Sequence, residues 1–307
     1  MANNRKISDD FLKKLIEGEY KEIIDFASKR ENELDVQIRD NYLNIYYRGG
    51  NLLKVRLRSL HFDEFYFHRG AKDMRKTHMI DKCKKGDKAC IARWEDYKKK
   101  RKEMLELFKE GGGMTTYCKE MTRIIDEWEK DLNTIGISHD EKHAQQQISM
   151  NNRGETDYTV VDLEYAVSRK SSFYYEGGLK KKVPRFDIIA VDKFGQLYVI
   201  ELKTGGDAID GESGICAHMD CFEYTIGRDQ DGAFVKEMSE LLEQKKALKL
   251  VGKNVFIDTS KKPQFIFAFS DKPRVNYGYE EFVNACQVRG YNGKILYVNN
   301  ERQLINQ

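Results

Sequence analysis

The sequence feature that most constrains the fold is a pair of apolar segments separated by a three-residue turn. The segments span residues 186–192 and 196–203 in the run RFDIIAVDKFGQLYVIELK. Both are apolar at nearly every position, which is typical of strands that are covered on both faces of a sheet. The turn is Lys193-Phe194-Gly195, and Gly195 suits the left-handed third position of a three-residue hairpin. We therefore expect two adjacent antiparallel strands at the centre of a sheet.

Three charged residues lie within these apolar segments: Asp187, Glu201 and Lys203. Burying isolated charges is costly, so we expect them to be paired or bound to a metal. Glu201 and Lys203 are two residues apart and share one face of their strand. The turn pairs Asp192 with Gln196, and counting back places Asp187 opposite Glu201, with Cβ atoms about 5 Å apart. A turn one residue shorter would move Asp187 to the other face.

This arrangement predicts phosphodiester chemistry. Two such carboxylates can share one divalent ion, and hard oxygen ligands favour Mg²⁺, with Mn²⁺ also possible. A metal-bound water can act as a nucleophile, and Lys203 can position that water or meet negative charge on the phosphate. The same triplet in Glu243-Gln244-Lys245 lies in a predicted helix, where the two charged side chains diverge. The alternative for residues 201–203 is a buried salt-bridge cluster without chemistry.

The segments around the hairpin predict an α/β/α core with a mixed sheet in residues 138–307. Periodicity predicts helices at about 139–150, 234–250 and 280–289. Strands are predicted at 158–167, 264–269 and 294–298, in addition to the two strands of the hairpin. The predicted order is therefore α-β-β-β-α-β-α-β.

This segment resembles the PD-(D/E)XK nuclease superfamily, whose restriction-endonuclease-like core has the order αβββαβ. The motif matches Asp187, Glu201 and Lys203, while Phe186 stands where the motif has Pro. The resemblance implies a nuclease that hydrolyses nucleic acid, DNA rather than RNA, with Mg²⁺ held by Asp187, Glu201 and Leu202. The superfamily also contains inactive members, so the alternative is a catalytically inactive module that binds nucleic acid or a protein partner.

The resemblance also implies an acidic residue from the first helix of the core. Glu141 is the candidate on that helix, and Glu164 on the first strand is its rival. Spacing does not separate the two. The three glutamines at 145–147 lie on the same helix as Glu141 and could contact substrate or solvent. The resemblance covers the C-terminal half of the chain only.

Residues 1–137 are predicted to form a separate α+β domain with a role in nucleic-acid binding. Helical spacing of apolar residues covers 9–29. Alternation over 36–68, with turns at 40–41 and 49–50, predicts an antiparallel meander of three or four strands. Further helices are predicted at about 91–110 and 116–132.

Basic residues gather in two places. Residues 69–102 contain 14 Lys or Arg against 5 Asp or Glu. Such a surplus favours a nucleic-acid partner, because basic side chains displace counterions from phosphates. The alternative is an ordinary solvated helix face. The candidate backbone-binding residues are Lys98, Lys99, Lys100 and Arg101 in this stretch, and Lys181, Lys182 and Arg185 before the hairpin. A homodimer is also compatible with the sequence.

The cysteines and the hydropathy pattern indicate the cellular compartment in which we expect the chain. Six cysteines are present without a CxxC pair, so we expect free thiols in a reducing compartment. Cys216, His218, Asp220 and Cys221 match no standard zinc spacing, and we expect a helix start with buried thiols there. The chain has no run of eighteen apolar residues and no N-terminal signal pattern. We therefore expect a cytoplasmic protein without a membrane partner.

Overall fold

The structure is a computed structural model. It describes residues 5–62, 86, 88, 91–92, 95, 99, 102–103, 106, 113–134, 140–154, 156–166, 173–175, 178–180, 185–203, 215–227, 231–269, 279–288, 290–291 and 293–306. Of the predicted helix at 91–110, the structure describes residues 91, 92, 95, 99, 102, 103 and 106, which are helical; the others lie outside the described residues.

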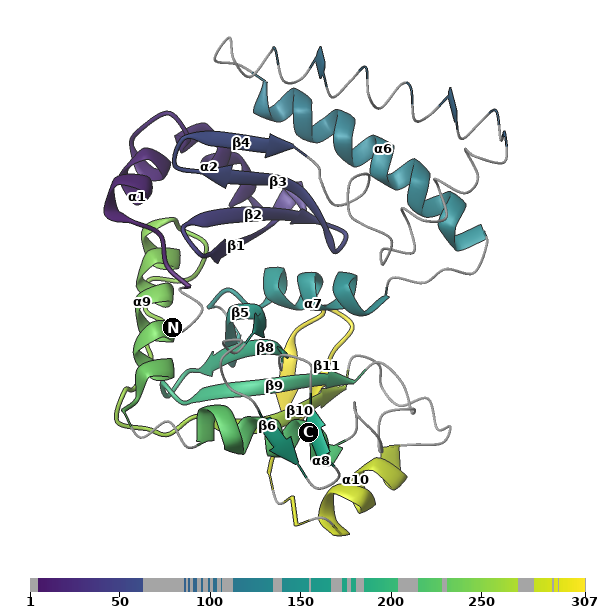
Figure 1. Ribbon diagram of the computed structural model, residues 1–307. Coiled ribbons are helices and arrows are strands. Elements are labelled where there is room, and N and C mark those ends of the chain that lie inside the picture. Colours follow the sequence, from purple (N-terminus) through teal and green to yellow (C-terminus); the bar gives the residue numbers. More distant parts are fainter. Residues whose placement is uncertain are drawn as a thin grey trace.

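The N-terminal part is a four-stranded antiparallel sheet with helices on one side (Figure 1). Its strands are β1 (Asp35–Arg39), β2 (Tyr42–Tyr47), β3 (Gly50–Arg56) and β4 (Ser59–Phe62), in the order β1-β2-β3-β4. The predicted meander is thus confirmed. Its helices are α1 (Asp9–Ile16), α2 (Lys21–Ala27), a short 3₁₀ turn (Arg30–Asn32) and α6 (Met114–Thr134).

The helical spacing over 9–29 corresponds to two helices, because the chain turns between α1 and α2. A Cβ at Gly18 would lie 2.9 Å from Lys14 Cα, so the chain passes too close to α1 there for a side chain. The Tyr20 N–H donates to Lys14 O at 3.1 Å, and this bond joins residues six apart in the sequence. A regular α-helical bond joins residues four apart, so the helix does not continue here. Local apolar periodicity continues through this turn and therefore did not reveal it.

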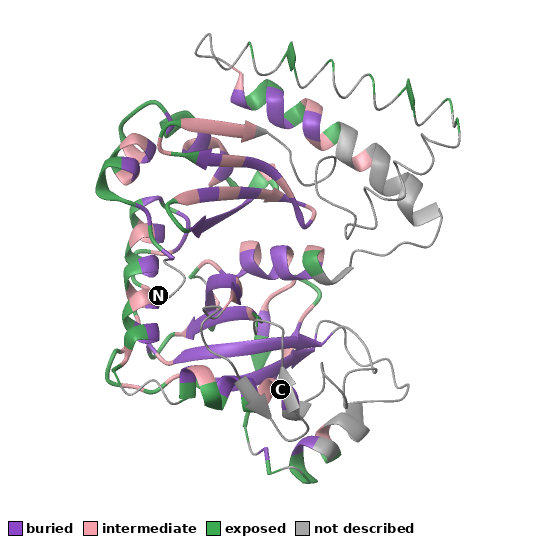
Figure 2. Cartoon of the chain, in the orientation of Figure 1, coloured by how far each residue is buried: buried purple, intermediate pink, exposed green. Residues whose placement is uncertain are grey.

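The two faces of the N-terminal sheet differ in character. On β2, Leu43, Ile45 and Tyr47 are buried in the core that α1, α2 and α6 share. The residues between them are only partly buried, and the alternation is visible along the strands in Figure 2. This second face carries polar and basic side chains and looks away from α6.

The C-terminal part is built on a six-stranded mixed sheet with the strand order β12-β11-β10-β9-β8-β5. The strands are β5 (Tyr158–Ala166), β8 (Arg185–Asp192), β9 (Leu197–Lys203), β10 (Gln264–Phe269), β11 (Ile295–Val298) and β12 (Leu304–Asn306). β10 runs parallel to β9 and β11, and the other pairs are antiparallel. The predicted mixed sheet and its central hairpin are confirmed. β12 and the small hairpin of β6 (Phe173–Tyr175) and β7 (Gly178–Lys180) were not predicted.

Helices cover both faces of this sheet (Figure 1). On one face, Ala144 and Ile148 of α7 (Asp140–Asn151) pack against Ile188 and Ile200. The opposite face packs against α8 (Ile215–Phe222), α9 (Ala233–Ala247) and α10 (Tyr279–Val288), through residues that include Phe222. A short π-helix (Glu223–Gly227) follows α8. The central strands are therefore buried on both sides, as their composition predicted.

The two halves are joined by hydrogen bonds as well as by apolar packing. Gln146 on α7 donates through Nε2 to Glu33 O (3.2 Å) and Tyr46 O (3.1 Å). Its Oε1 accepts from the Gly49 N–H. One cluster of buried side chains also runs from α1 and α2 to α8 and α9. The N-terminal sheet is thus fixed in position over α7.

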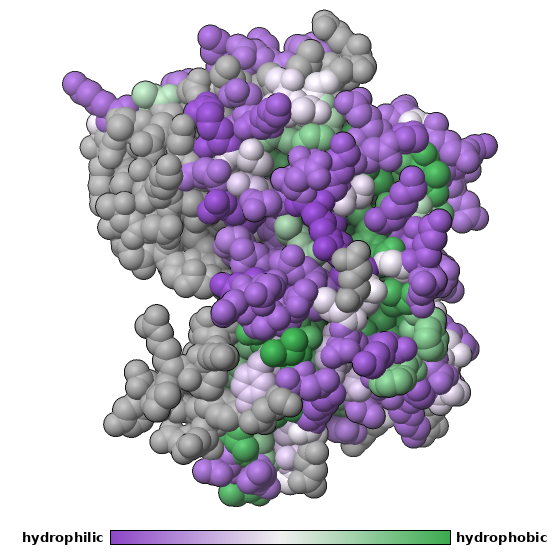
Figure 3. Space-filling view, turned by 180° about the vertical axis from the view of Figure 1, so that it is seen from behind, coloured by the Kyte–Doolittle hydropathy of each residue, from purple (hydrophilic) through white to green (hydrophobic). Residues whose placement is uncertain are grey.

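The face of the molecule that Figure 3 shows is mostly hydrophilic where it is described, with hydrophobic residues in small patches. Within the described residues, no helix combines the length and the apolar character needed to cross a bilayer.

Candidate functional site

The turn between β8 and β9 has the predicted geometry. Asp192 and Gln196 close it through a bond from the Asp192 N–H to Gln196 O (3.1 Å). Gly195 has φ +79°, the left-handed conformation expected at the third turn position. The main chain of Asp258 lies against this turn, because its N–H donates to Gly195 O at 2.9 Å.

The ladder that follows has the predicted register. It runs from Val191↔Leu197 to Ile188↔Ile200, which confirms the predicted register over these residues. Continued by one residue, this register would bring Asp187 opposite Glu201, but the paired ladder ends at Ile188. The position of the Asp187 carboxylate therefore depends on the backbone at the end of the ladder.

At Asp187 the alternation of side chains between the two faces of β8 is interrupted. Its neighbours Phe186 and Ile188 would share one face of a regular strand, yet they pack in opposite cores. The residues on either side of Glu164 on β5 do the same, and Glu164 itself has φ +48°. The register places Glu164 beside Asp187, so the irregularity crosses both strands. This irregularity of the backbone redirects the neighbouring side chains, although the register of the two strands shifts elsewhere, between Val160 and Asp162.

The half-buried Asp187 carboxylate accepts hydrogen bonds from two directions. Oδ2 accepts from the Leu202 N–H at 2.9 Å, and Oδ1 accepts from Gln145 Nε2 at 3.1 Å. The first bond places the carboxylate against the main chain of the Glu201-Leu202-Lys203 segment. The bond from Gln145 holds the Asp187 carboxylate from the side of α7. Of the three glutamines at 145–147, Gln145 is thus the one seen to contact the candidate site.

Glu201 and Lys203 form a buried ion pair with a third partner. Lys203 Nζ lies 3.3 Å from Glu201 Oε1, and the two residues are 5% and 6% exposed. His218 Nε2 lies 3.1 Å from the same oxygen. His218 comes from α8, which covers this face of the sheet. The sequence offered only a weak signal for it, a lone histidine in an apolar helix.

The third acidic residue implied by the resemblance remains a prediction. The Glu164 carboxylate lies 3.9 Å from both Lys142 Nζ and Arg185 Nη1. Glu141 lies on α7, but its side chain is outside the described part of the chain. Among the described residues, no three His, Cys, Asp or Glu side chains gather closely enough to hold a metal ion. The described carboxylates at the site are thus Asp187 and Glu201.

The basic candidates are described only in part. Lys99 is exposed and lies 3.9 Å from Glu103, and Arg185 is exposed beside Glu164. Lys98, Lys100, Arg101, Lys181 and Lys182 lie outside the described residues.

The described cysteines are buried thiols. Cys118, Cys221 and Cys286 are buried and form no disulfide bond with one another. Burial raises the pKa of the Cys118 thiol to about 12, so it stays protonated and unreactive. Cys221 lies in the core next to Phe222, while His218 of the same helix is turned toward Glu201.

A pocket of about 60 Å³ lies between the polar face of the N-terminal sheet and the first turns of α7. Asn44 and Tyr46 of β2 line one side. Lys142, Gln145 and Glu164 line the other. Because Gln145 also donates to Asp187, the pocket directly adjoins the candidate site.

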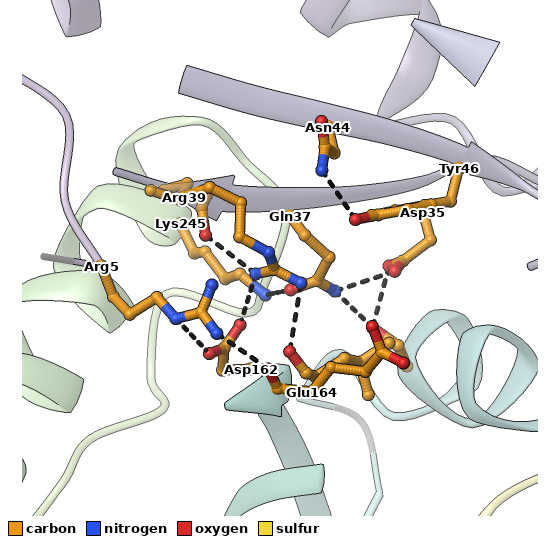
Figure 4. A network of polar contacts seen from close by, with 12 residues as sticks. Arg5, Asp35, Gln37, Arg39, Asn44, Tyr46, Asp162, Glu164 and Lys245 are labelled. Atoms are coloured by element: carbon orange, nitrogen blue, oxygen red, sulfur yellow. Dashed lines mark hydrogen bonds and ion pairs between the residues drawn. The ribbon is translucent and has the colours of Figure 1, made fainter. Parts of the chain in front are cut away.

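Beside this pocket, a buried polar network ties the two halves together (Figure 4). Asp162 of β5 is fully buried between Arg5 Nε (3.0 Å) and Arg39 Nη1 (2.7 Å). Lys245 of α9 donates to Gln37 Oε1 at 3.0 Å. Burial lowers the pKa of Lys245 to about 8. These charged groups form ion pairs with one another, which indicates a structural role.

Comparison of the chain with protein-family models, curated proteins and solved structures found no match in any of the three. Function is therefore inferred from the residues and their geometry.

Proposed function

We propose that the chain is a metal-dependent nuclease that hydrolyses phosphodiester bonds, with DNA as the expected substrate. The observation that carries this proposal is the hydrogen bond from Leu202 N–H to Asp187 Oδ2. It holds one carboxylate against the segment that carries Glu201 and Lys203. A restriction-endonuclease-like core fits the layering of helices on both faces of the mixed sheet.

The oxygen atoms near Asp187 suit a hard divalent ion. The N–H and C=O of one strand residue point toward the same edge, so Leu202 directs its carbonyl oxygen to the side of Asp187. Asp187 and the Leu202 carbonyl would hold Mg²⁺ or Mn²⁺ together with Glu201, whose carboxylate would have to turn from Lys203 and His218 on the α8 side of the sheet toward Asp187. Magnesium needs only one or two protein carboxylates because it keeps several waters. The ion would supply an activated water and neutralise charge on the phosphate.

Other residues of the chain would orient the metal-binding carboxylate, stabilise the reacting phosphate and hold the nucleic-acid backbone. Gln145 orients the Asp187 carboxylate from α7. Lys203, buried beside Glu201, places a positive charge next to the reacting phosphate, where low dielectric strengthens its effect. The basic residues at 98–101, with Lys181, Lys182 and Arg185, would hold the nucleic-acid backbone.

The test is a cleavage assay with Mg²⁺ over a panel of single-stranded, duplex and branched substrates. Glu201→Gln should abolish cleavage, and Lys203→Ala should lower the rate about 100- to 1,000-fold. Glu243→Gln is the matched control, because Glu243 begins the same Glu-x-Lys triplet on α9 and its own side chain is exposed. It should cleave like the wild type.

Melting curves test the metal without a substrate. Mg²⁺ should raise the melting temperature of the wild type by mass action, and Asp187→Ala should remove that effect. A structural ion pair predicts the reverse: no response to Mg²⁺, and loss of about 3–5 kcal/mol of stability when Lys203 is removed. That result, together with no cleavage of any substrate, would leave the inactive binding module as the better explanation.

A further inference from the structure

The polar face of the N-terminal sheet is basic and aromatic. It includes Tyr42, Asn44 and Tyr46 on β2, Lys54 and Arg56 on β3, and His61 on β4, all partly or fully exposed. The register aligns Tyr42 with Arg56, and Asn44 with Lys54. Among the charged residues of β2, β3 and β4, Lys54 and Arg56 lie on this face and no Asp or Glu does, while the register adds the buried Asp35 from β1. The exposed charges of these three strands are therefore basic, which favours a polyanionic partner.

Two cations on this face lie over one aromatic ring. Lys54 Nζ lies 4.0 Å from the centroid of the Tyr42 ring, and the Arg56 guanidinium lies 5.2 Å from it. An aromatic ring beside positive groups is the combination that binds a base by stacking and its phosphate by charge. The bases of a duplex are already stacked on each other, so such a platform suits an unpaired strand.

The polar face leads into the pocket beside Asp187. Asn44 and Tyr46 belong to both, and Gln145 on the far wall donates to Asp187. Asn44 Nδ2 donates to the Tyr46 hydroxyl oxygen at 2.7 Å. This bond leaves the hydroxyl hydrogen of Tyr46 as a donor, and Asn44 Oδ1 is a buried acceptor without a hydrogen-bond partner. A donor beside an acceptor matches the hydrogen-bonding edge of a nucleobase.

The size of the pocket agrees with this ligand. Its volume of about 60 Å³ is room for roughly four waters at about 15 Å³ each. A planar base can replace such a group of waters and keep their hydrogen bonds to Asn44 and Tyr46.

We propose that the polar face of the N-terminal sheet binds a single-stranded segment of nucleic acid and delivers one of its bases to the pocket beside Asp187. That this strand is also the substrate rests on the proposed nuclease function. The binding itself does not depend on cleavage.

Binding is measured with the full chain, a chelator in place of metal, and a fluorescent oligonucleotide followed by anisotropy. The single strand should bind at least tenfold more tightly than its duplex. Lys54→Gln combined with Arg56→Gln should weaken single-strand binding. The double variant should also reduce the slope of log affinity against log salt by about 1.4, since each lost phosphate contact contributes about 0.7.

Lys13→Gln combined with Lys29→Gln is the matched control. It removes two exposed charges from the helical side of the sheet, opposite the polar face. Its affinity and salt slope should stay close to those of the wild type. Equal effects of the two double variants would overturn the proposal, as would equal binding of single strand and duplex.

A second comparison, between an intact and an abasic strand, separates the contribution of base contacts to the affinity from that of phosphate charge. Tyr42→Leu should weaken binding on the order of 10- to 100-fold, because one stacking contact is lost. Tyr46→Phe removes only a hydroxyl and should weaken binding of the intact strand. Neither variant should affect an abasic strand of the same length, which keeps its phosphates. Equal losses for both strands would contradict a base in the pocket. Melting temperatures near the wild-type value confirm that the variants are folded.

The outcomes for the two proposals are distinguishable. Specific single-strand binding without cleavage in Mg²⁺ would refute the nuclease and support the binding surface. Cleavage that is unaffected by the variants on β2 and β3 would refute the binding surface and leave the nuclease.

Discussion

At the scale of single residues, the network around Asp162 makes the sharpest prediction. Its carboxylate is fully buried between Arg5 and Arg39, so Asp162→Asn leaves two guanidinium groups without their counter-charge. The free energy of unfolding should fall by about 3–5 kcal/mol in urea denaturation. The exposed ion pair of Asp157 and Lys193 supplies the control, and Asp157→Asn should change stability by less than about 1 kcal/mol. Similar values for both variants would mean that the network contributes little.

Lys245 predicts an unusual pH dependence. Burial lowers its pKa to about 8, against about 10.5 in the unfolded chain, although Asp35 and Asp162 oppose the shift. Between these pH values the unfolded chain binds a proton that the folded chain does not. Stability should therefore rise with pH through this window, by up to about 3 kcal/mol. Urea denaturation at pH 7.5, 8.5 and 9.5 measures it. Lys245→Met should remove the rise, and an unchanged slope in that variant would assign the effect to other groups.

At the scale of elements, the β8–β9 hairpin depends on its turn. A Cβ at Gly195 would lie 2.6 Å from Phe256 Cε2 and 2.9 Å from Asp258 N. Gly195→Ala should therefore cost about 1–2 kcal/mol for its positive φ and more for the contact with the main chain. Gly232 is the matched control, because its φ is +62° and nothing lies within 4 Å of its Cβ position. Denaturation curves should show a clearly larger loss of unfolding free energy for Gly195→Ala than for Gly232→Ala. Equal losses would mean that the contact with Phe256 and Asp258 costs nothing.

At the scale of the whole molecule, the contacts of Gln146 predict that the two halves unfold together. Its side chain bonds with the main chain of Glu33, Tyr46 and Gly49 in the N-terminal half, and Gln146→Ala should leave these main-chain groups, of which Gly49 N–H is buried, without this partner. Hydrogen exchange in increasing urea should show amides of β2 and β9 losing protection at one free energy. Gln146→Ala should lower that free energy for both strands. Earlier exchange of β2 in the wild type would instead show an independently unfolding N-terminal domain.

The sequence by itself determined the N-terminal meander, five strands of the C-terminal sheet, and the central hairpin with its register from Val191↔Leu197 to Ile188↔Ile200. Period-two alternation and turn chemistry are local properties, so the three-residue turn ending at Gly195 was enough to set that register. The same local reasoning failed at Gly18, where close approach to α1 ends the helix although the apolar spacing continues.

The tertiary structure decided what surrounds these residues. Leu202 and Gln145 meet the Asp187 carboxylate because β8 and β5 change face together, and His218 meets Glu201 because α8 covers β9. The pocket beside Asp187 exists because Gln146 holds a sheet formed by residues 35–62 against a helix that begins at residue 140. Periodicity records which face of an element is buried, but not which distant element will cover it. Only the packing of segments far apart in the chain supplies that information.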